Sequence, residues 1–279
     1  MATFTNQATL SYRNITVSSN IVTGEIAEVL SVAKTAVSEA YSAGEVLTYT
    51  VSLVNSGTVP LTGITVTDDL GAYDYNGTTL VPLTYVDGSA LYFANGVLQP
   101  APSAAGGQTL VISDITVPAN GNAVIIYQAS ANGFAPLEAG SSVTNTVTAV
   151  GTGVPAVTAS ATIPAANEAV LSINKALSPS EVTEDSQITY SFLIQNTGNT
   201  AESGAVINDT FAPVLSNITV GIDGAAALST DYSYDEVTGE FETNKGAFTV
   251  PAAAYTRDPV TGVYTTTPGT VTVTVTGTI

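Results

Sequence analysis

The sequence predicts an all-β protein made of tandem β-sandwich domains. Short apolar runs rich in Thr and Val alternate with turn residues along the 279-residue chain, which is the pattern of strands in a sandwich. Apolar residues make up 44% of the chain and charged residues 10%, so the chain folds around a core. An internal repeat divides it into two parts, each long enough for a core of its own.

The repeat aligns residues 30–70 with residues 171–211 without a gap, at an offset of 141 positions. The motif Asn55-Ser56-Gly57, for example, matches Asn196-Thr197-Gly198. Residues 121–131 match residues 269–279, where the second copy is expected to break off. The first copy continues with further strand sequence to residue 163.

The segment that the second copy lacks has a counterpart at the N-terminus. Residues 3–24 resemble residues 142–164, as if a domain had been cut at an exposed loop and its end moved to the front. We therefore expect an N-terminal donor-strand segment, a complete sandwich and an incomplete sandwich, at residues 1–26, 27–166 and 167–279.

Spacing supports this interpretation. Lys34 precedes Asn145 by 111 positions. If a second molecule followed end to end, Lys175 would precede its Asn6 by 110 positions. One molecule's tail and the next molecule's head thus add up to one complete domain.

Three polar residues of each copy fall where strand alternation predicts core. Every second side chain of a strand shares a face, and these residues share faces with Leu, Val and Ile. They are Lys34, Asp68 and Asn145 in the first copy, and Lys175, Asp209 and Asn6 for the second. Two of the chain's three lysines occupy these equivalent positions, each followed by an aspartate at an offset of 34.

Burial of such charges favours covalent chemistry. Desolvation lowers the pKa of a lysine and raises that of an aspartate, which gives a nucleophilic amine beside a carboxyl that can polarise an amide and carry a proton. The expected product is a Lys–Asn isopeptide bond, with Asp68 and Asp209 as assisting acids. The alternative is that each lysine extends to water at a strand end and each asparagine makes a turn.

Composition excludes several other functions. A net charge of −18 with five basic residues argues against nucleic acid as a partner. The absence of His and Cys removes most catalytic triads, thiol sites and metal sites, so we expect no enzyme beyond autocatalytic bond formation, no cofactor and no metal. Asp68, Asp69 and Asp74 could form a calcium site, but a solvated loop beside one buried acid is preferred. No stretch is long enough to span a membrane.

These motifs resemble a known family. The Lys strand, the Tyr-Thr-Val stretch that leads into Asn55, the Val-Thr-Asp-Asp-Leu stretch at Asp68 and the Val-Thr-Asn-Thr-Val stretch at Asn145 are similar to the tandem conserved-repeat domain of unknown function, number eleven, of Gram-positive surface proteins. The layout also resembles the isopeptide-locked immunoglobulin-like domains of pilins and adhesins. The resemblance implies an extracellular shaft or fibre, and a carboxylate that assists the Lys–Asn bond.

We therefore expect a filament subunit at a cell or spore surface. Its second sandwich is completed by donor strands from a neighbouring copy, so that its partner is a head-to-tail homopolymer of itself. Lys34 and Asn145 would join within the molecule, and Lys175 and Asn6 between molecules. The expected inward residues of the donor strand are Phe4, Asn6, Ala8 and Leu10. The alternative is an adhesin or stalk fragment that binds a ligand through tyrosine-rich loops at residues 73–85 or 232–241.

Overall fold

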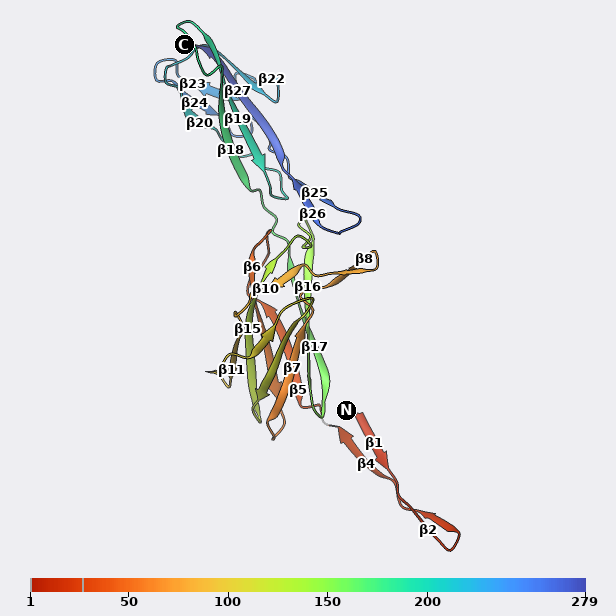
Figure 1. The fold of residues 1–279 in the computed structure, drawn as a ribbon. Coiled ribbons are helices and arrows are strands. Elements are labelled where there is room, and N and C mark those ends of the chain that lie inside the picture. The colour runs from red at the N-terminus through yellow and green to blue at the C-terminus, as the bar shows by residue number, and fades with distance from the viewer. Residues whose placement is uncertain (1, 27) are drawn as a thin grey trace. The chain divides into compact units, whose positions relative to one another are not determined.

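A computed structural model describes residues 2–26 and 28–279, and the side chains of all of these except Ala2, Glu25 and Ile26. The described chain consists of strands and their connections, which confirms the all-β fold class (Figure 1). No helix in this part of the chain is long and apolar enough to cross a membrane. The chain divides into two compact units. The first takes residues up to Glu39, Gly44–Asn132 and Val143–Ile163, and the second takes Ala40–Ala43, Gly133–Ser142 and Pro164–Ile279.

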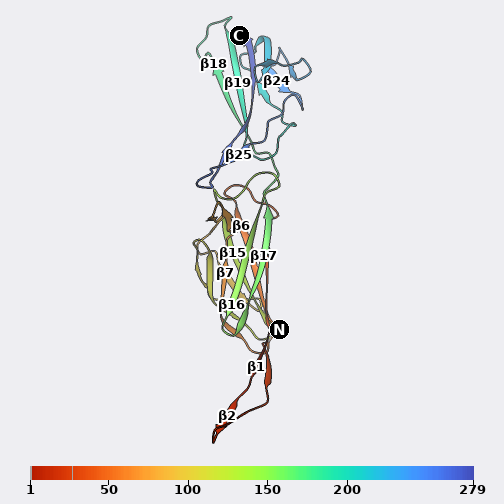
Figure 2. The same cartoon turned by 90° about the vertical axis from the view of Figure 1, so that its right-hand side faces the viewer.

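The sandwich of the first unit, here called copy 1, has two sheets of antiparallel strands (Figure 2). The first sheet has the order β12 (Val97–Leu98), β11 (Leu91–Ala94), β15 (Gly121–Ala131), β6 (Val46–Asn55), β5 (Leu30–Ala36), with β10 (Leu83–Tyr85) also on β15. The second sheet has the order β13 (Ser103–Ala105), β14 (Leu110–Val117), β7 (Leu61–Asp68), β16 (Ser142–Gly151), β17 (Val154–Pro164). A small hairpin of β8 (Tyr73–Tyr75) and β9 (Thr78–Leu80) lies outside both sheets.

Copy 1 has its core between these sheets because the strands alternate apolar and polar side chains. On β6 every second residue is buried, and the same is true of β15 and β16. β7 pairs with β14 on one edge and with β16 on the other, so neither edge is free. The core of copy 1 thus needs β16 on its second sheet.

The Asn-x-Gly motif of each copy is a structural feature. The side chain of Asn55 accepts a hydrogen bond from the Gly57 N–H and donates to the carbonyls of Val59 and Pro118. Asn196 repeats this pattern in the second copy, with Gly198 as donor and with Thr200 and Pro251 as acceptors. Both asparagines are buried, so these bonds satisfy polar groups that water cannot reach.

The sandwich of the second unit, here called copy 2, has one full sheet and one short one. The full sheet has the order β18 (Leu171–Ser178), β19 (Gln187–Asn196), β27 (Gly269–Thr278), β21 (Ser216–Ile222), β22 (Ala225–Ala226). The short sheet has the order β20 (Asn208–Thr210), β24 (Glu240–Thr243), β23 (Tyr232–Tyr234), and β25 (Ala254–Arg257) pairs separately with β26 (Tyr264–Thr267). β20 corresponds to the end of β7, but in the described chain it is an edge strand.

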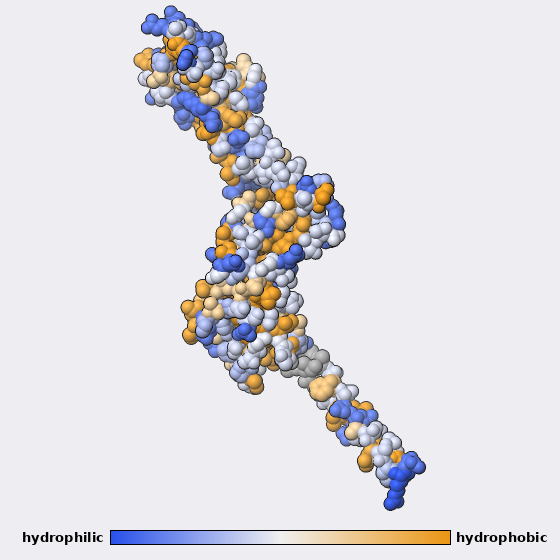
Figure 3. All heavy atoms as spheres, viewed as in Figure 1, coloured by the Kyte–Doolittle hydropathy of each residue, from blue (hydrophilic) through white to orange (hydrophobic). Residues whose placement is uncertain are grey.

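The first residues of the chain form the N-terminal hairpin, defined as residues 2–26. It contains the pair β1 (Ala2–Asn6) and β4 (Val22–Ile26) and the pair β2 (Thr9–Tyr12) and β3 (Ile15–Ser18). Hydrophobic residues alternate with hydrophilic ones on its surface (Figure 3). Phe4 is 56% exposed and Leu10 is 63% exposed.

Candidate covalent cross-link sites

The site in copy 1 joins both sheets. Lys34 lies on β5 of the first sheet, and Asp68 ends β7 of the second sheet. Asp68 lies opposite Val147 in the pairing of β7 with β16. Asn145 is two residues before Val147 and therefore points to the same face. All three polar side chains are buried in the core, as the alternation of their strands requires.

A continuous set of polar contacts connects the three residues. Lys34 Nζ lies 2.5 Å from Asp68 Oδ2. The hydroxyl of Tyr127, on β15, donates a hydrogen bond of 2.5 Å to the same carboxylate oxygen. Asn145 Nδ2 donates a hydrogen bond of 3.1 Å to the Tyr127 hydroxyl. One carboxylate oxygen and one hydroxyl therefore connect the lysine amine to the asparagine amide.

Burial dominates the electrostatics of this site. It lowers the pKa of Lys34, and the attraction of Asp68 opposes that shift without cancelling it. Burial likewise raises the pKa of Tyr127 and of Tyr49, with the charge of Asp68 adding to both shifts. Lys34 Nζ lies 5.0 Å from the ring centroid of Tyr49, which is stacked on Tyr127. Burial thus favours the neutral, nucleophilic form of the amine, whereas the aromatic ring faces and Asp68 favour its charged form.

Two buried polar atoms at this site make no hydrogen bond of acceptable geometry with any described residue. They are Asn145 Oδ1 and the hydroxyl oxygen of Tyr49. The amide of Asn145 nevertheless lies close enough to Tyr49 to act on the pKa of its hydroxyl. A buried acceptor without a hydrogen bond costs free energy. Asn145 Oδ1 is the atom that a protonated carboxyl would polarise during attack on the amide.

The corresponding site in copy 2 has the same first pair in a different environment. Lys175 on β18 forms an ion pair with Asp209 on β20, but 41% of the lysine side chain is exposed. The lysine nitrogen also lies 4.4 Å from the ring centroid of Tyr190 and 5.5 Å from that of Phe211. Copy 2 therefore has the amine, the acid and the aromatic surroundings, while the face of β18 that holds the lysine is open.

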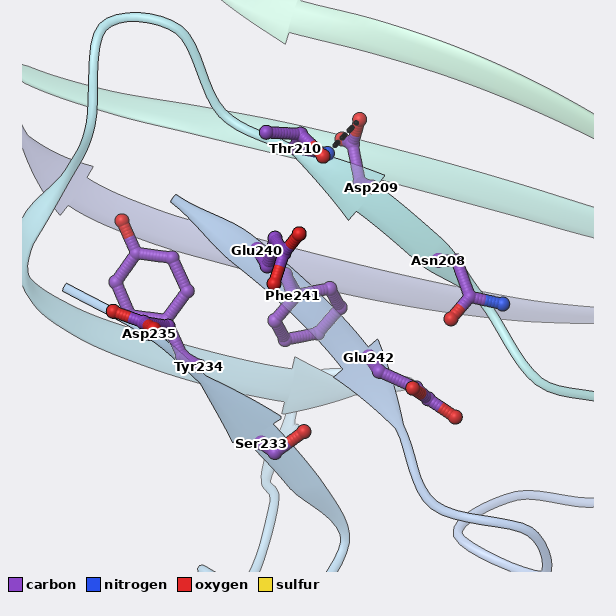
Figure 4. Close-up of a pocket in the computed structure, with 9 residues that line it drawn as sticks. All are labelled: Asn208, Asp209, Thr210, Ser233, Tyr234, Asp235, Glu240, Phe241 and Glu242. Atoms are coloured by element: carbon purple, nitrogen blue, oxygen red, sulfur yellow. Dashed lines mark hydrogen bonds between the residues drawn. The ribbon is translucent and has the colours of Figure 1, made fainter. Parts of the chain in front are cut away.

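One cavity of copy 2 lies along its short sheet, and another lies beside β18. One, of about 750 Å³, is lined by residues of β20, β23 and β24 (Figure 4). Figure 4 shows Asp209 and Thr210 on β20 near Phe241 of β24. The other, of about 240 Å³, lies between β18 and the segment that leads into β20. The residues that line it are Leu171, Ser172, Ile173, Ile194, Ala205, Val206, Ile207 and Phe248.

The expected donor residues lie on the first two strands of the N-terminal hairpin. Phe4 and Asn6 are on β1, Leu10 is on β2, and Ala8 lies between the two strands. All four are exposed. Asn6 and Lys175 belong to different units, and the structure of one chain does not test their bond. Phe4 packs its ring over Gly24 on the neighbouring strand, where a Cβ atom would lie 2.3 Å from the ring.

The N-terminal hairpin repeats the geometry of the β16–β17 hairpin. Thr5 lies opposite Thr23 in the N-terminal hairpin, and Thr144 hydrogen-bonds to Thr162 in the β16–β17 hairpin. Both residues of the second pair follow those of the first by 139 positions. The two-residue turns Arg13–Asn14 and Thr152–Gly153 keep the same offset. This register matches the donor residues to buried residues of β16, in the order Phe4, Asn6, Ala8, Leu10 to Val143, Asn145, Val147, Ala149.

Two residues of the copy 1 site were not found by sequence reasoning. Tyr127 continues an inward alternation on its strand, but the matching residue of copy 2 is Val275, so the repeat gave no signal. At Asp69 the sequence indicates only a solvated loop, with a calcium site as the alternative. In the structure its Oδ1 accepts hydrogen bonds of 2.8 Å from the backbone N–H groups of Gly71 and Thr146. Asp69 thus fixes β16 beside β7, next to Asn145.

Comparisons with known proteins identify no family. No family model matches the chain, and no curated protein matches it, so the resemblance to the tandem repeat domain stays a prediction. Among solved structures, the pilus backbone RrgB of Streptococcus pneumoniae is 14% identical with a TM-score of 0.36, over 86% of this chain and 55% of that chain.

The same comparison finds two further solved structures. The major pilin subunit BcpA of Bacillus cereus is 12% identical with a TM-score of 0.36, over 96% of this chain and 73% of its own. The type II cohesin dyad of the scaffoldin ScaA from Acetivibrio cellulolyticus is 10% identical with a TM-score of 0.29, over 89% and 85% of the two chains. Likenesses at this level carry no argument about function.

Proposed function

We propose that this chain is the structural subunit of an extracellular filament at a cell or spore surface, assembled head-to-tail by donor-strand complementation and locked by Lys–Asn isopeptide bonds. One observation carries the proposal. The exposed N-terminal hairpin has the register and turn spacing of β16–β17, and β20 has a free edge at the position where β7 pairs with β16.

Assembly follows from that correspondence. The N-terminal hairpin of one molecule adds beside β20 of another molecule, in the way that β16 lies beside β7. Ala8 then lies opposite Asp209. Burial of a large apolar side chain such as Phe4 or Leu10 contributes about 2 kcal/mol. The contact joins unlike surfaces of two copies, so it propagates into a fibre unless it closes into a ring.

The bond within copy 1 forms between two groups that Asp68 and Tyr127 already connect. Lys34 gives a proton to Asp68, which leaves a neutral amine and a neutral carboxyl. The amine nitrogen attacks the Asn145 carbonyl carbon, and the carboxyl relays one proton from the attacking nitrogen to the leaving nitrogen. The C–N bond of the side-chain amide breaks, ammonia leaves, and the isopeptide bond remains. The buried pair of charges is lost in the reaction.

The bond between copies uses the same chemistry after docking. The incoming Asn6 takes the position that Asn145 has in copy 1, beside Lys175 and Asp209. The donor hairpin covers β18, so it shields the Lys175 amine from water as the core of copy 1 shields Lys34. Covalent closure therefore follows assembly, because an undocked Lys175 stays exposed to solvent.

The test is electrophoresis of assembled material after boiling in detergent. Wild-type chains are expected to give a ladder of multimers. Asn6→Ala retains the strand pattern and removes the electrophile, so fibres should form and then dissolve to monomers. Lys175→Ala should behave like Asn6→Ala. The matched control is Lys245→Ala, because the third lysine has no counterpart in the repeat and should leave the ladder unchanged.

Two further results separate the donor role from the covalent bond. Deletion of residues 2–24 should abolish extension and leave an apolar surface that binds a hydrophobic dye. Equal fibre formation by the deleted chain would contradict strand donation. Monomers alone from boiled wild-type fibres would contradict the covalent bond and leave non-covalent strand exchange. A ladder that stops at two would indicate a closed dimer instead of a fibre.

A further inference from the structure

The two hairpins differ at the inward position that follows Ala149. In copy 1 this position is Gly151, the last residue of β16. A Cβ atom on Gly151 would lie 2.3 Å from Ile64 Cδ1 of β7, so a larger residue there would require the end of the isoleucine side chain to move within the core. Val150 lies opposite Thr65, which places Gly151 beside Ile64 in the register of β7 and β16. Gly151 is thus a glycine because of a close side-chain approach.

The corresponding pair has the opposite sizes in the rest of the chain. The register of the N-terminal hairpin matches Gly151 with Tyr12, which ends β2 and is 52% exposed. The repeat matches Ile64 with Ala205 in copy 2. Ala205 lines the 240 Å³ cavity between β18 and the segment before β20. In copy 1 the sandwich residue is large and the hairpin residue is small. For copy 2 the sandwich residue is small and the hairpin residue is large.

We infer that Tyr12 and Ala205 form a size lock, meaning a pair of residues whose sizes fit only each other. It directs the N-terminal hairpin of a second molecule into copy 2 and excludes that hairpin from copy 1. This inference rests on the proposed strand donation and names the residues that give it specificity. Tyr12 would insert its ring into the apolar cavity beside Ala205, where Leu171, Ile173 and Phe248 are available for packing. In copy 1 the same ring would overlap Ile64, and overpacking of this kind is unfavourable.

The size lock would prevent the N-terminal hairpin from competing with the β16–β17 hairpin for copy 1. Copy 1 is held by β16–β17, whose register the N-terminal hairpin shares, so strand alternation alone would let the donor compete for copy 1. Such competition would displace β16 and remove Asn145 from Lys34. A steric conflict against the wrong partner combined with a fit to the right one is the usual basis of specificity.

Full-length variants test the lock through rates of assembly. Ala205→Ile should fill the cavity and slow extension by about tenfold or more. Tyr12→Gly should leave the cavity empty and weaken the fibres. The double variant Tyr12→Gly, Ala205→Ile reproduces the pairing of copy 1 and should recover extension. Thr9→Gly and Ala201→Ile are matched controls at exposed positions of the same segments and should assemble as wild type.

A second measurement uses thermal unfolding of copy 1 and does not need assembly. Gly151→Tyr should lower the unfolding temperature of copy 1, and Ile64→Ala with Gly151→Tyr should recover part of that loss. Rapid extension by Ala205→Ile, or a double variant no better than Ala205→Ile alone, would overturn the size lock while wild-type fibres still supported strand donation. No recovery in the copy 1 pair would also overturn it. Failure of wild type to assemble would instead overturn the proposed function.

Discussion

Copy 1 and copy 2 share an amine–acid pair but differ in what covers it. The Lys34 side chain has no exposed surface, whereas that of Lys175 is 41% exposed. The difference extends along the whole strand: Leu30 is 4% exposed and the matching Leu171 is 38% exposed. In copy 1 the face opposite β5 includes β16, and in copy 2 β20 is an edge strand. Burial of Lys34 therefore depends on the β16–β17 hairpin, and β20 has no such hairpin beside it in the described chain.

This comparison separates positioning from activation. The sandwich brings the lysine to the aspartate in both copies, with Nζ and Oδ2 in contact. In copy 1 the environment also lowers the pKa of the lysine, and burial is the largest cause. In a filament the same activation would arrive with the donor hairpin, so the joint could react only after it had formed. Docking and covalent closure would then occur in a fixed order.

The strongest way to break the comparison is to remove the acid from each copy. Asp68→Ala leaves the buried amine of Lys34 without its partner, so we expect copy 1 to lose about 3–5 kcal/mol of stability. It should also keep the mass of the uncross-linked chain. Asp209→Ala removes the partner of a largely exposed amine, so we expect a loss of less than about 1 kcal/mol before assembly. Denaturant unfolding and intact mass spectrometry measure the two effects.

Equal losses in the two variants would mean that the environments do not differ as the exposures indicate. A wild-type mass equal to that of the sequence, with no peptide joined to Lys34, would remove the bond within copy 1. Asp69→Ala helps to interpret the result, because Asp69 fixes β16 through the Thr146 N–H, while its charge also raises the pKa of Lys34. It should slow the reaction and leave the acid in place.

Tyr127 sharpens the comparison with a smaller effect. Its hydroxyl donates to Asp68 and accepts from the Asn145 amide, and copy 2 has Val275 at this position. Tyr127→Phe should destabilise the uncross-linked copy 1 by about 1–3 kcal/mol, because it leaves buried groups without hydrogen bonds. Release of ammonia should be slower, since the amide is no longer held. The measurement is the rate of mass loss in freshly refolded protein.

Tyr49→Phe is the matched control for Tyr127→Phe. The two rings stack 5.5 Å apart, but the Tyr49 hydroxyl makes no hydrogen bond with the described residues. Its removal should change stability little and leave the rate of ammonia release near that of wild type. If both variants behaved alike, the aromatic surroundings rather than the hydroxyl of Tyr127 would be responsible for positioning the amide.

The sequence contained much of this arrangement because strand alternation and an internal repeat are both periodic signals. Alternation placed Lys34, Asp68 and Asn145 on inward faces, and the structure buries all three. The repeat matched β27 to β15, which pair with β19 and β6 in the same register from Asn196 and Asn55 onward. Each signal depends on local sequence that either alternates or recurs.

Features that belong to one copy could not be predicted in this way. Tyr127 has no counterpart that would have marked it, and its role depends on the contact of β15 with residues from β7 and β16. The close approach of the Ile64 side chain to Gly151 likewise depends on side-chain positions that only the structure provides. The first of these contacts crosses between the two sheets and the second joins neighbouring strands of one sheet, and neither the alternation nor the repeat describes such side-chain packing.

The smallest expected effect is a dependence of stability on pH that copy 1 shows before its bond forms. The variant Asn145→Ala keeps Lys34 as a free amine, whose pKa is lowered from 10.5 mainly by burial. The folded protein then releases this proton at a lower pH than the unfolded chain, so stability should rise as pH increases toward 10. Tyr49 and Tyr127 act in the opposite direction above their ordinary pKa of 10.0, because burial raises both values and the unfolded chain ionises first.

Denaturant unfolding of the Asn145→Ala variant should therefore show a rise in stability below pH 10 that is absent when Lys34→Met is added. A stability that falls with pH over that range in the first variant would contradict a lowered pKa of the buried amine.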